Sequence, residues 1–242
     1  PPATHSTPRA APRPGRTDRL GASLGAGPAC PPKTLRPLRQ YLVTVTAREG
    51  LTRRLGEMGL GRDATGQPAY AVGNSAIVFR VRHDGRLRAL RCFLRPMRHL
   101  REIYGERLFE RELYLYTSPT TGEWVDVVLD EWIEGETLRE AVHRAASDGD
   151  RERLAALAAA FDRLALAMVR DDRAHGDLKP ENVIVDPAGR LHPIDHDATF
   201  LPAFAGEPSP ELGTAAYQHP ARTAADFDAS LDDYPAALIS TA

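Results

Sequence analysis

Three kinds of feature are scarce in this chain, and each scarcity argues against a class of protein. Only two of the 242 residues are cysteine, Cys30 and Cys92, which argues against a disulfide-stapled secreted scaffold. No apolar run approaches the roughly 18 residues that a membrane-spanning helix needs. The 31 basic and 33 acidic residues nearly cancel, so there is no electrostatic basis for binding nucleic acid or an anionic membrane. We therefore expect a cytoplasmic protein with no membrane span.

Lysine is the scarcest of the charged residues. Of the 31 basic residues, 29 are arginine, and lysine occurs only at positions 33 and 179. A compact ammonium group and a planar guanidinium fork are not interchangeable beside a phosphate. The lysine at position 179 therefore indicates a place where an ammonium group has a specific role.

Lys179 belongs to a motif that carries the groups needed for phosphoryl transfer. Residues 175–185 read HGDLKPENVIV, and residues 194–197 read IDHD. One carboxylate (Asp177) can orient an attacking hydroxyl, the lysine can steady the transferring phosphate, and an amide and a second carboxylate (Asn182 and Asp195) can hold metal ions. The alternative is a hydrogen-bonded turn before a strand, but such a turn has no need of Asp195.

The motif resembles the catalytic loop and the metal-binding loop of the protein-kinase superfamily. The resemblance implies that Asp177 is the catalytic base, that Lys179 neutralises the γ-phosphate of ATP, and that Asn182 and Asp195 bind Mg²⁺. A lysine two residues after the base is the pattern of Ser/Thr kinases, and residues 213–220 (GTAAYQHP) resemble the end of an activation segment. A protein substrate that is phosphorylated on serine or threonine is therefore implied.

The same resemblance assigns nucleotide contacts to the first half of the chain. Residues 71–78 correspond to the glycine-rich loop, although only the central glycine is retained, and Arg91 stands where the family has lysine. Arg91 is expected to pair with a glutamate from a helix over residues 98–116, with Glu110 favoured over Glu106. The implied nucleotide-binding residues of this half are Gly73, Val78, Arg91, Glu110, Glu131 and Ile133.

Hydrophobic periodicity and turn signals predict the order of elements. Strands are expected within residues 67–95, with a turn at His83-Asp84-Gly85, and again from residue 124. Helices are expected over residues 98–116, 137–146 and 151–172. With the resemblance, this order predicts an α+β, two-lobed, protein-kinase-like fold with a small antiparallel-sheet N-lobe and a mainly helical C-lobe. The predicted divisions are a disordered Pro/Gly-rich tail (1–38), a helical lead-in (39–66), the N-lobe (67–133) and an incomplete C-lobe (134–242).

Two other functions fit the same residues. Arg91 and the altered glycine-rich loop are consistent with a pseudokinase that binds nucleotide as a scaffold. The HGD and I-D-x-D sequences also occur in small-molecule kinases of the aminoglycoside or choline phosphotransferase kind. The sequence makes no prediction about the oligomeric state.

Overall fold

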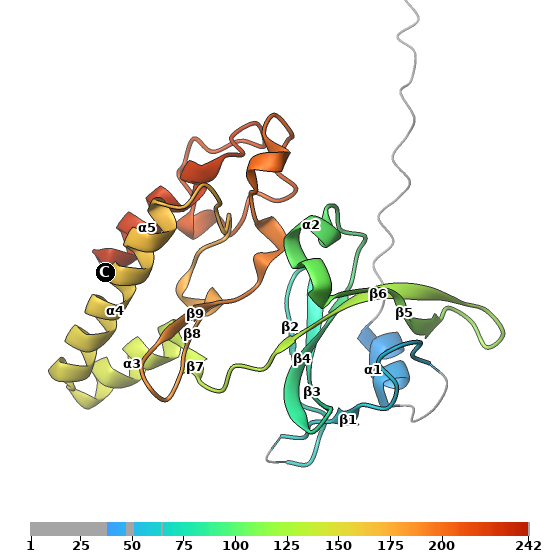
Figure 1. Ribbon diagram of the computed structural model, residues 1–242. Coiled ribbons are helices and arrows are strands. Elements are labelled where there is room, and N and C mark those ends of the chain that lie inside the picture. Colours follow the sequence, from blue (N-terminus) through green and yellow to red (C-terminus); the bar gives the residue numbers. More distant parts are fainter. Residues whose placement is uncertain (1–37, 47–50, 64, 242) are drawn as a thin grey trace, which may run out of the picture. The chain divides into compact units, whose positions relative to one another are not determined.

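The strands and helices are segregated along the chain, with an antiparallel sheet first and a mainly helical half after it (Figure 1). The computed structural model describes residues 38–46, 51–63 and 65–241, which belong to one unit spanning Thr34–Ala242. This segregation agrees with the predicted α+β class. The predicted tail, residues 1–38, lies outside the described residues except for Leu38.

Six strands form a curled antiparallel sheet. They are β1 (Gly59–Leu60), β2 (Tyr70–Val72), β3 (Ala76–His83), β4 (Arg86–Phe93), β5 (Leu108–Tyr116) and β6 (Gly122–Glu131). Their order is β1-β3-β4-β6-β5, and β2 pairs with the same edge of β3 as β1 does. The β3–β4 hairpin turns at Asp84 and Gly85, whose φ angles of 49° and 75° are typical of a two-residue primed turn. The predicted hairpin is therefore confirmed.

Helix α1 (Leu38–Thr46) covers one face of the sheet. Tyr41 is fully buried and donates its hydroxyl to the carbonyl oxygen of Phe93 over 2.5 Å. The core beneath α1 draws its buried residues from the helix, the following segment and four strands: Tyr41, Val45, Leu55, Ile77, Phe79, Val81, Leu90, Cys92, Leu113, Leu115, Val125 and Val127. Residues 51–58 form bends and an isolated bridge, so the described part of the predicted lead-in is helical only in α1.

The helix predicted over residues 98–116 is wrong beyond its first turn. Helix α2 covers only Leu100–Tyr104 and ends at Gly105, which has a φ of 54°. A 3₁₀ turn over Gly105–Arg107 then leads directly into β5. Helix α2 packs on a second, smaller core of the sheet, which contains Phe93, Tyr104 and Val128.

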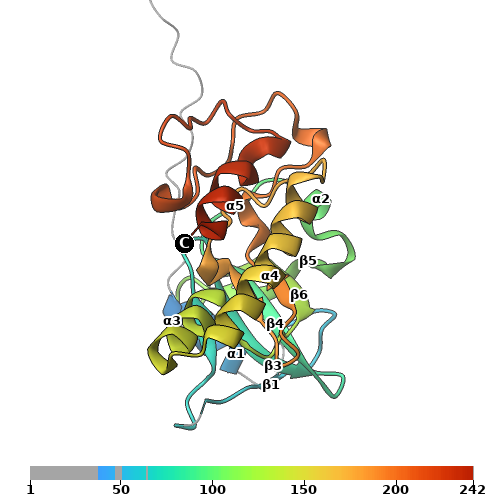
Figure 2. The same cartoon turned by 90° about the vertical axis from the view of Figure 1, so that its left-hand side faces the viewer.

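Three helices lie in the second half: α3 (Leu138–Asp148), α4 (Arg151–Val169) and α5 (Asp233–Ser240). Figure 2 shows them stacked beside one another. The helices predicted over residues 137–146 and 151–172 are confirmed as α3 and α4. A capping box at Thr137 and Glu140 starts α3. The buried residues shared by these helices and the adjoining strands are Leu138, Ala141, Leu157, Phe161, Ala165, Leu178, Val183, Val185 and Ala236.

A small antiparallel sheet and several 3₁₀ turns connect these helices. The sheet has the order β7-β8-β9, with β7 at Glu136–Thr137, β8 at Val183–Val185 and β9 at Leu191–Pro193. The 3₁₀ turns are Pro180–Asn182, His196–Ala198, Pro202–Phe204, Ala215–Tyr217 and Ala229–Asp232. Within the part of the chain that the structure describes, no helix is both long enough and apolar enough to cross a membrane.

Candidate active site

The loop between α4 and β8 carries the predicted catalytic residues, and a buried carboxylate fixes its backbone. Asp232, only 1% exposed, lies in the 3₁₀ turn before α5. Its two oxygens accept the backbone N–H groups of His175 and Gly176 at 2.5 and 3.0 Å. The His175 ring is held in turn by a 2.7 Å contact between Nε2 and the Ile194 carbonyl oxygen. The start of the motif is therefore tied to both α5 and the IDHD segment.

Gly176 packs directly on the 3₁₀ turn His196–Ala198, which follows Asp195. Its φ is +77°, and a Cβ at this position would lie 2.2 Å from the carbonyl oxygen of Ala198. A side chain is excluded both by the left-handed backbone and by the close approach of a second backbone segment. The glycine before Asp177 therefore lets the two loops of the motif meet.

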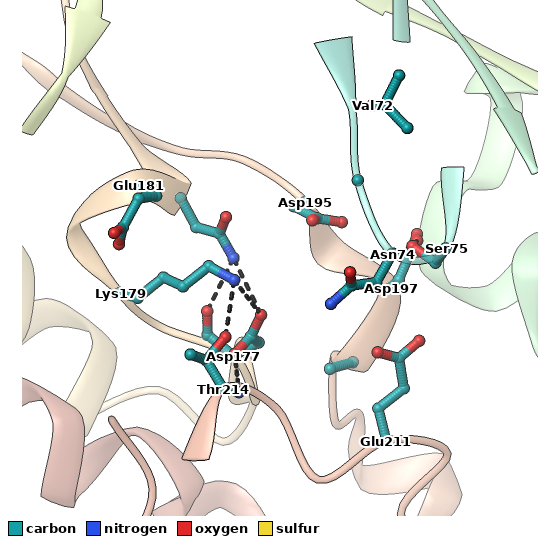
Figure 3. Close-up of a pocket in the computed structure, with 13 residues that line it drawn as sticks. Val72, Asn74, Ser75, Asp177, Lys179, Glu181, Asp195, Asp197, Glu211 and Thr214 are labelled. Atoms are coloured by element: carbon teal, nitrogen blue, oxygen red, sulfur yellow. Dashed lines mark hydrogen bonds and ion pairs between the residues drawn. The ribbon is translucent and has the colours of Figure 1, made fainter. Parts of the chain in front are cut away.

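Asp177, Lys179, Asn182 and Thr214 form one hydrogen-bonded cluster (Figure 3). Lys179 Nζ donates to Asp177 Oδ2 at 3.0 Å and to Thr214 Oγ1 at 2.8 Å. The other Asp177 oxygen, Oδ1, accepts the Thr214 backbone N–H at 2.5 Å. Asn182 Nδ2 donates to the Asp177 carbonyl oxygen at 2.9 Å. The structure thus brings Thr214 together with the three loop residues predicted from the motif.

A second cluster faces the first across a pocket and is built around Asp197. The Arg91 side chain donates to Asp197 twice, from Nε to Oδ1 at 3.1 Å and from Nη2 to Oδ2 at 2.5 Å. The hydroxyls of Tyr104 and Ser75 donate to the same carboxylate. Arg91 Nη2 also pairs with Asp195. This cluster joins β4, α2 and the β2–β3 turn to the IDHD segment.

The ionisation of this second cluster follows from its burial and its charges. Burial by itself would raise the pKa of Asp197, but the Arg91 guanidinium and the donated hydrogen bonds outweigh burial and lower it. Burial likewise disfavours the charged form of Arg91, yet Tyr104 and the two aspartates raise its pKa above the ordinary value. Asp197 and Arg91 therefore form a charged, buried ion pair.

The pocket between the clusters has a volume of about 350 Å³. Its lining comprises Val72, Gly73, Asn74, Ser75, Asp177, Lys179, Glu181, Asn182, Asp195, Asp197, Ala198, Glu211 and Thr214. Glu211 pairs with Arg95 at the rim, although burial, reinforced by the nearby aspartates, raises the pKa of Glu211. Five of the lining side chains are carboxylates and one is an amine, so the pocket can hold cations beside a polyanion.

The residues predicted from the nucleotide-binding half are only partly at this pocket. Gly73 lines it, as expected for a loop that approaches phosphate groups. Val78 pairs with Arg91 in the β3–β4 ladder, and Arg91 lies behind the two aspartates, so neither side chain lines the pocket. Glu131 ends β6, and neither it nor Ile133 lines the pocket.

The predicted pairing of Glu110 with Arg91 is wrong. Glu110 lies on β5, is 50% exposed and pairs with Arg101 at 2.7 Å. The runner-up, Glu106, falls in the 3₁₀ turn before β5. The glutamate of this region that the structure buries completely is Glu112, whose Oε1 accepts the backbone N–H groups of residues 53–55 at 2.7–2.8 Å. It fixes the segment after α1 and has no contact with Arg91.

The donor set suits a magnesium ion that keeps most of its own water and phosphate ligands. Mg²⁺ commonly takes only one or two protein carboxylates and uses substrate oxygens for the rest. From the described residues Asp195 accepts a single hydrogen bond, at Oδ1, and Asn182 uses its NH₂ group as donor, which leaves its amide oxygen as a ligand. No cluster of three or more His, Cys, Asp or Glu groups suited to a metal occurs among the described residues. Asn182 and Asp195 are therefore the pocket residues that could hold Mg²⁺.

Reasoning from the sequence alone gave no role to Asp197, Ser75 or Tyr104. The one signal for Asp197 was its place as a second carboxylate two residues after Asp195. Neither the protein-family models nor the curated proteins match this chain.

Proposed function

We propose that the protein is an ATP- and Mg²⁺-dependent kinase with a two-lobed protein-kinase-like fold, which transfers the γ-phosphate of ATP to a serine or threonine hydroxyl of a protein. The observation that carries this proposal is the shared pocket. Asp177, Lys179, Asn182 and Asp195 all line it, with Gly73 on the opposite wall. Phosphoryl transfer is catalysed mainly by positioning and by electrostatic stabilisation, and these four groups supply both.

In this proposal Asp177 receives the proton of the acceptor hydroxyl while that oxygen bonds to the γ-phosphorus and ADP departs. The Thr214 backbone N–H and Lys179 hold the two carboxylate oxygens, so the base has a fixed orientation. Lys179 stabilises the charge on the transferring phosphate. Bound Mg²⁺ supplies further neutralisation of the phosphate oxygens, with Asn182 and Asp195 as its protein ligands.

The choice of a protein acceptor is supported by the contact of Lys179 with Thr214. Thr214 lies in the segment that resembles the end of an activation segment, and its hydroxyl is 2.8 Å from Lys179 Nζ. A hydroxyl-bearing side chain that enters the pocket along this segment would meet both groups.

One observation favours a second candidate, a nucleotide-binding scaffold without transferase activity. Arg91 pairs with Asp195, the proposed metal ligand, and does not line the pocket. If Arg91 came to occupy both oxygens of Asp195 in the presence of nucleotide, ATP would bind without being positioned for transfer.

The test is transfer of label from ATP carrying a radioactive γ-phosphate, with Mg²⁺, to casein, to histone and to a panel of amino alcohols. The protein, Asp177→Asn and Asp171→Asn are compared. Asp171 pairs with Arg173 outside the pocket, so its variant serves as the matched carboxylate control. We expect labelled protein with the parent and with Asp171→Asn but not with Asp177→Asn. Labelled amino alcohol alone would contradict the protein acceptor, and nucleotide binding without any transfer would favour the scaffold.

A further inference from the structure

Asp197 has no capacity left for a metal ion. A carboxylate offers about four acceptor positions. Asp197 uses all four: Oδ1 accepts from Arg91 Nε and Tyr104, and Oδ2 accepts from Arg91 Nη2 and Ser75. The side chain is 4% exposed. Although it lies at the edge of the pocket (Figure 3), it is committed to groups of the protein.

Asp195 is bonded very differently. Among the described residues it accepts one hydrogen bond, from Arg91 Nη2 to Oδ1, and its side chain is 30% exposed. Its backbone is held in the left-handed region, at a φ of 68°, which costs energy and is found at sites where a side chain must point in one direction. Asp195 thus presents its second oxygen, Oδ2, for another ligand.

Arg91 is shared between these two carboxylates, and the sharing is unequal. Its Nε and Nη2 form a two-point fork on Asp197, whereas Asp195 receives only the remaining capacity of Nη2. A guanidinium prefers such a two-point fork over a single contact. The carboxylate that binds both Nε and Nη2 therefore determines how many hydrogen bonds Arg91 can donate to the other carboxylate.

We propose that Asp197 is a positioning residue that holds the fork of Arg91 away from Asp195, so that Arg91 occupies one oxygen of Asp195 and leaves the other free for Mg²⁺. This inference rests on the proposed kinase function. It gives Arg91 a partner, Asp197, outside residues 98–116, where a glutamate partner was expected from the sequence. Protein groups that orient a metal ligand typically change metal affinity about 10–100-fold when they are removed.

Asp197→Asn is the direct perturbation. The amide keeps the shape of the side chain but loses its charge, so Arg91 is left with Asp195 as its only carboxylate partner in this cluster. The fork should then close on both oxygens of Asp195 and compete with Mg²⁺. We expect the Mg²⁺ concentration for half-maximal binding of a fluorescent methylanthraniloyl-ATP to rise at least about tenfold, with a matching rise in the Mg²⁺ needed for phosphotransfer.

Two further variants separate positioning from loss of structure. Adding Arg91→Met to Asp197→Asn removes the competing cation, so the Mg²⁺ requirement should return toward the parent value. Asp186→Asn is the control, because Asp186 is also a buried carboxylate that accepts a hydrogen bond from an arginine side chain, Arg190 Nε at 2.7 Å, but lies in the β8–β9 turn. It should lower thermal stability and leave the Mg²⁺ requirement unchanged. If Asp197→Asn does not fold, Asp197→Glu, which retains the charge, should fold and keep a Mg²⁺ requirement near that of the parent.

The outcomes distinguish this inference from the proposed function. A folded Asp197→Asn variant with an unchanged Mg²⁺ requirement, or a raised requirement that persists after Arg91 is removed, overturns the inference while the kinase proposal stands. An Asp197→Glu variant with the raised requirement overturns it as well. If the parent protein shows no Mg²⁺-dependent binding of nucleotide, the proposed function and this inference are both overturned.

Discussion

Replacing Gly176 with alanine tests whether the two loops of the motif depend on direct backbone contact. The residue has a φ of +77°, and a Cβ there would lie 2.2 Å from the Ala198 carbonyl oxygen. A Cβ in the left-handed region costs about 1–2 kcal/mol. Overpacking against a fixed neighbour adds about 1–3 kcal/mol. We therefore expect Gly176→Ala to lower the free energy of unfolding by about 2–5 kcal/mol.

Gly189→Ala supplies a matched control, because Gly189 has the same φ of +77°. A Cβ at that position would meet only the Arg153 side chain, at 3.6 Å, an ordinary contact. The control should therefore lose only the backbone contribution, about 1–2 kcal/mol. Urea denaturation of the parent and both variants, followed by circular dichroism, gives the two free-energy differences.

The difference between the two variants isolates the contact with Ala198. The contact also carries a functional expectation, because Ala198 follows Asp197 in the same 3₁₀ turn. Gly176→Ala should weaken binding of Mg²⁺-ATP, whereas Gly189→Ala should not. Equal losses of stability in the two variants would refute the reasoning, since the backbone angle alone would then account for both.

Three further changes have expected outcomes of different kinds. Glu112→Ala removes the side-chain acceptor of the backbone N–H groups of residues 53–55, although that of Arg53 keeps the Glu112 carbonyl oxygen as a second acceptor. The change should cost at least about 2 kcal/mol in urea denaturation, whereas Glu110→Ala removes an exposed ion pair and should cost less than about 1 kcal/mol; equal costs would contradict the assignment of the buried glutamate. Lys179→Arg should lower the rate of phosphotransfer at least about tenfold with little change in stability, because the guanidinium fork differs in size and geometry from the ammonium group; an unchanged rate would remove the specific role of the lysine. Hydrogen bonds from the Thr137 backbone and hydroxyl lower the pKa of Glu140. At pH 7 the parent should therefore be more stable than Glu140→Gln by roughly 0.5 kcal/mol, and this difference should shrink as the pH falls below the ordinary pKa of 4.5. A difference in stability that grows in acid would contradict the lowered pKa.

The strands and the longer helices could be predicted from the sequence because each has a local signal. The Asp84-Gly85 turn separates two runs of β-branched and apolar residues, and the apolar stripe of α4 recurs at helical spacing. The helix predicted over residues 98–116 is wrong beyond Tyr104, although apolar residues from Leu100 to Leu108 recur at helical spacing. Gly105 ends the helix, and pairing with β6 then overrides the local preference of β5.

The candidate site also has a part that could be predicted from the sequence and a part that could not. Asp177, Lys179 and Asn182 lie within six consecutive residues, so their proximity could be predicted from spacing, and the structure brings them together around one pocket. The partner of Arg91 could not be read in this way, because Asp197 is 106 residues away and the pairing depends on how the IDHD segment folds against the sheet. Long-range ion pairs of this kind leave no periodic signal in the sequence.

The most direct test of the proposed kinase activity is the single-turnover rate of phosphotransfer with saturating ATP and Mg²⁺, measured for the parent, Asp177→Ala and Asp195→Ala. Loss of the catalytic base should lower the rate by at least about 100-fold while binding of fluorescent ATP is retained. Asp195→Ala should lose both transfer and Mg²⁺-dependent binding. Transfer that continues at the parent rate in both variants would contradict the assignment of this pocket as a phosphoryl-transfer site.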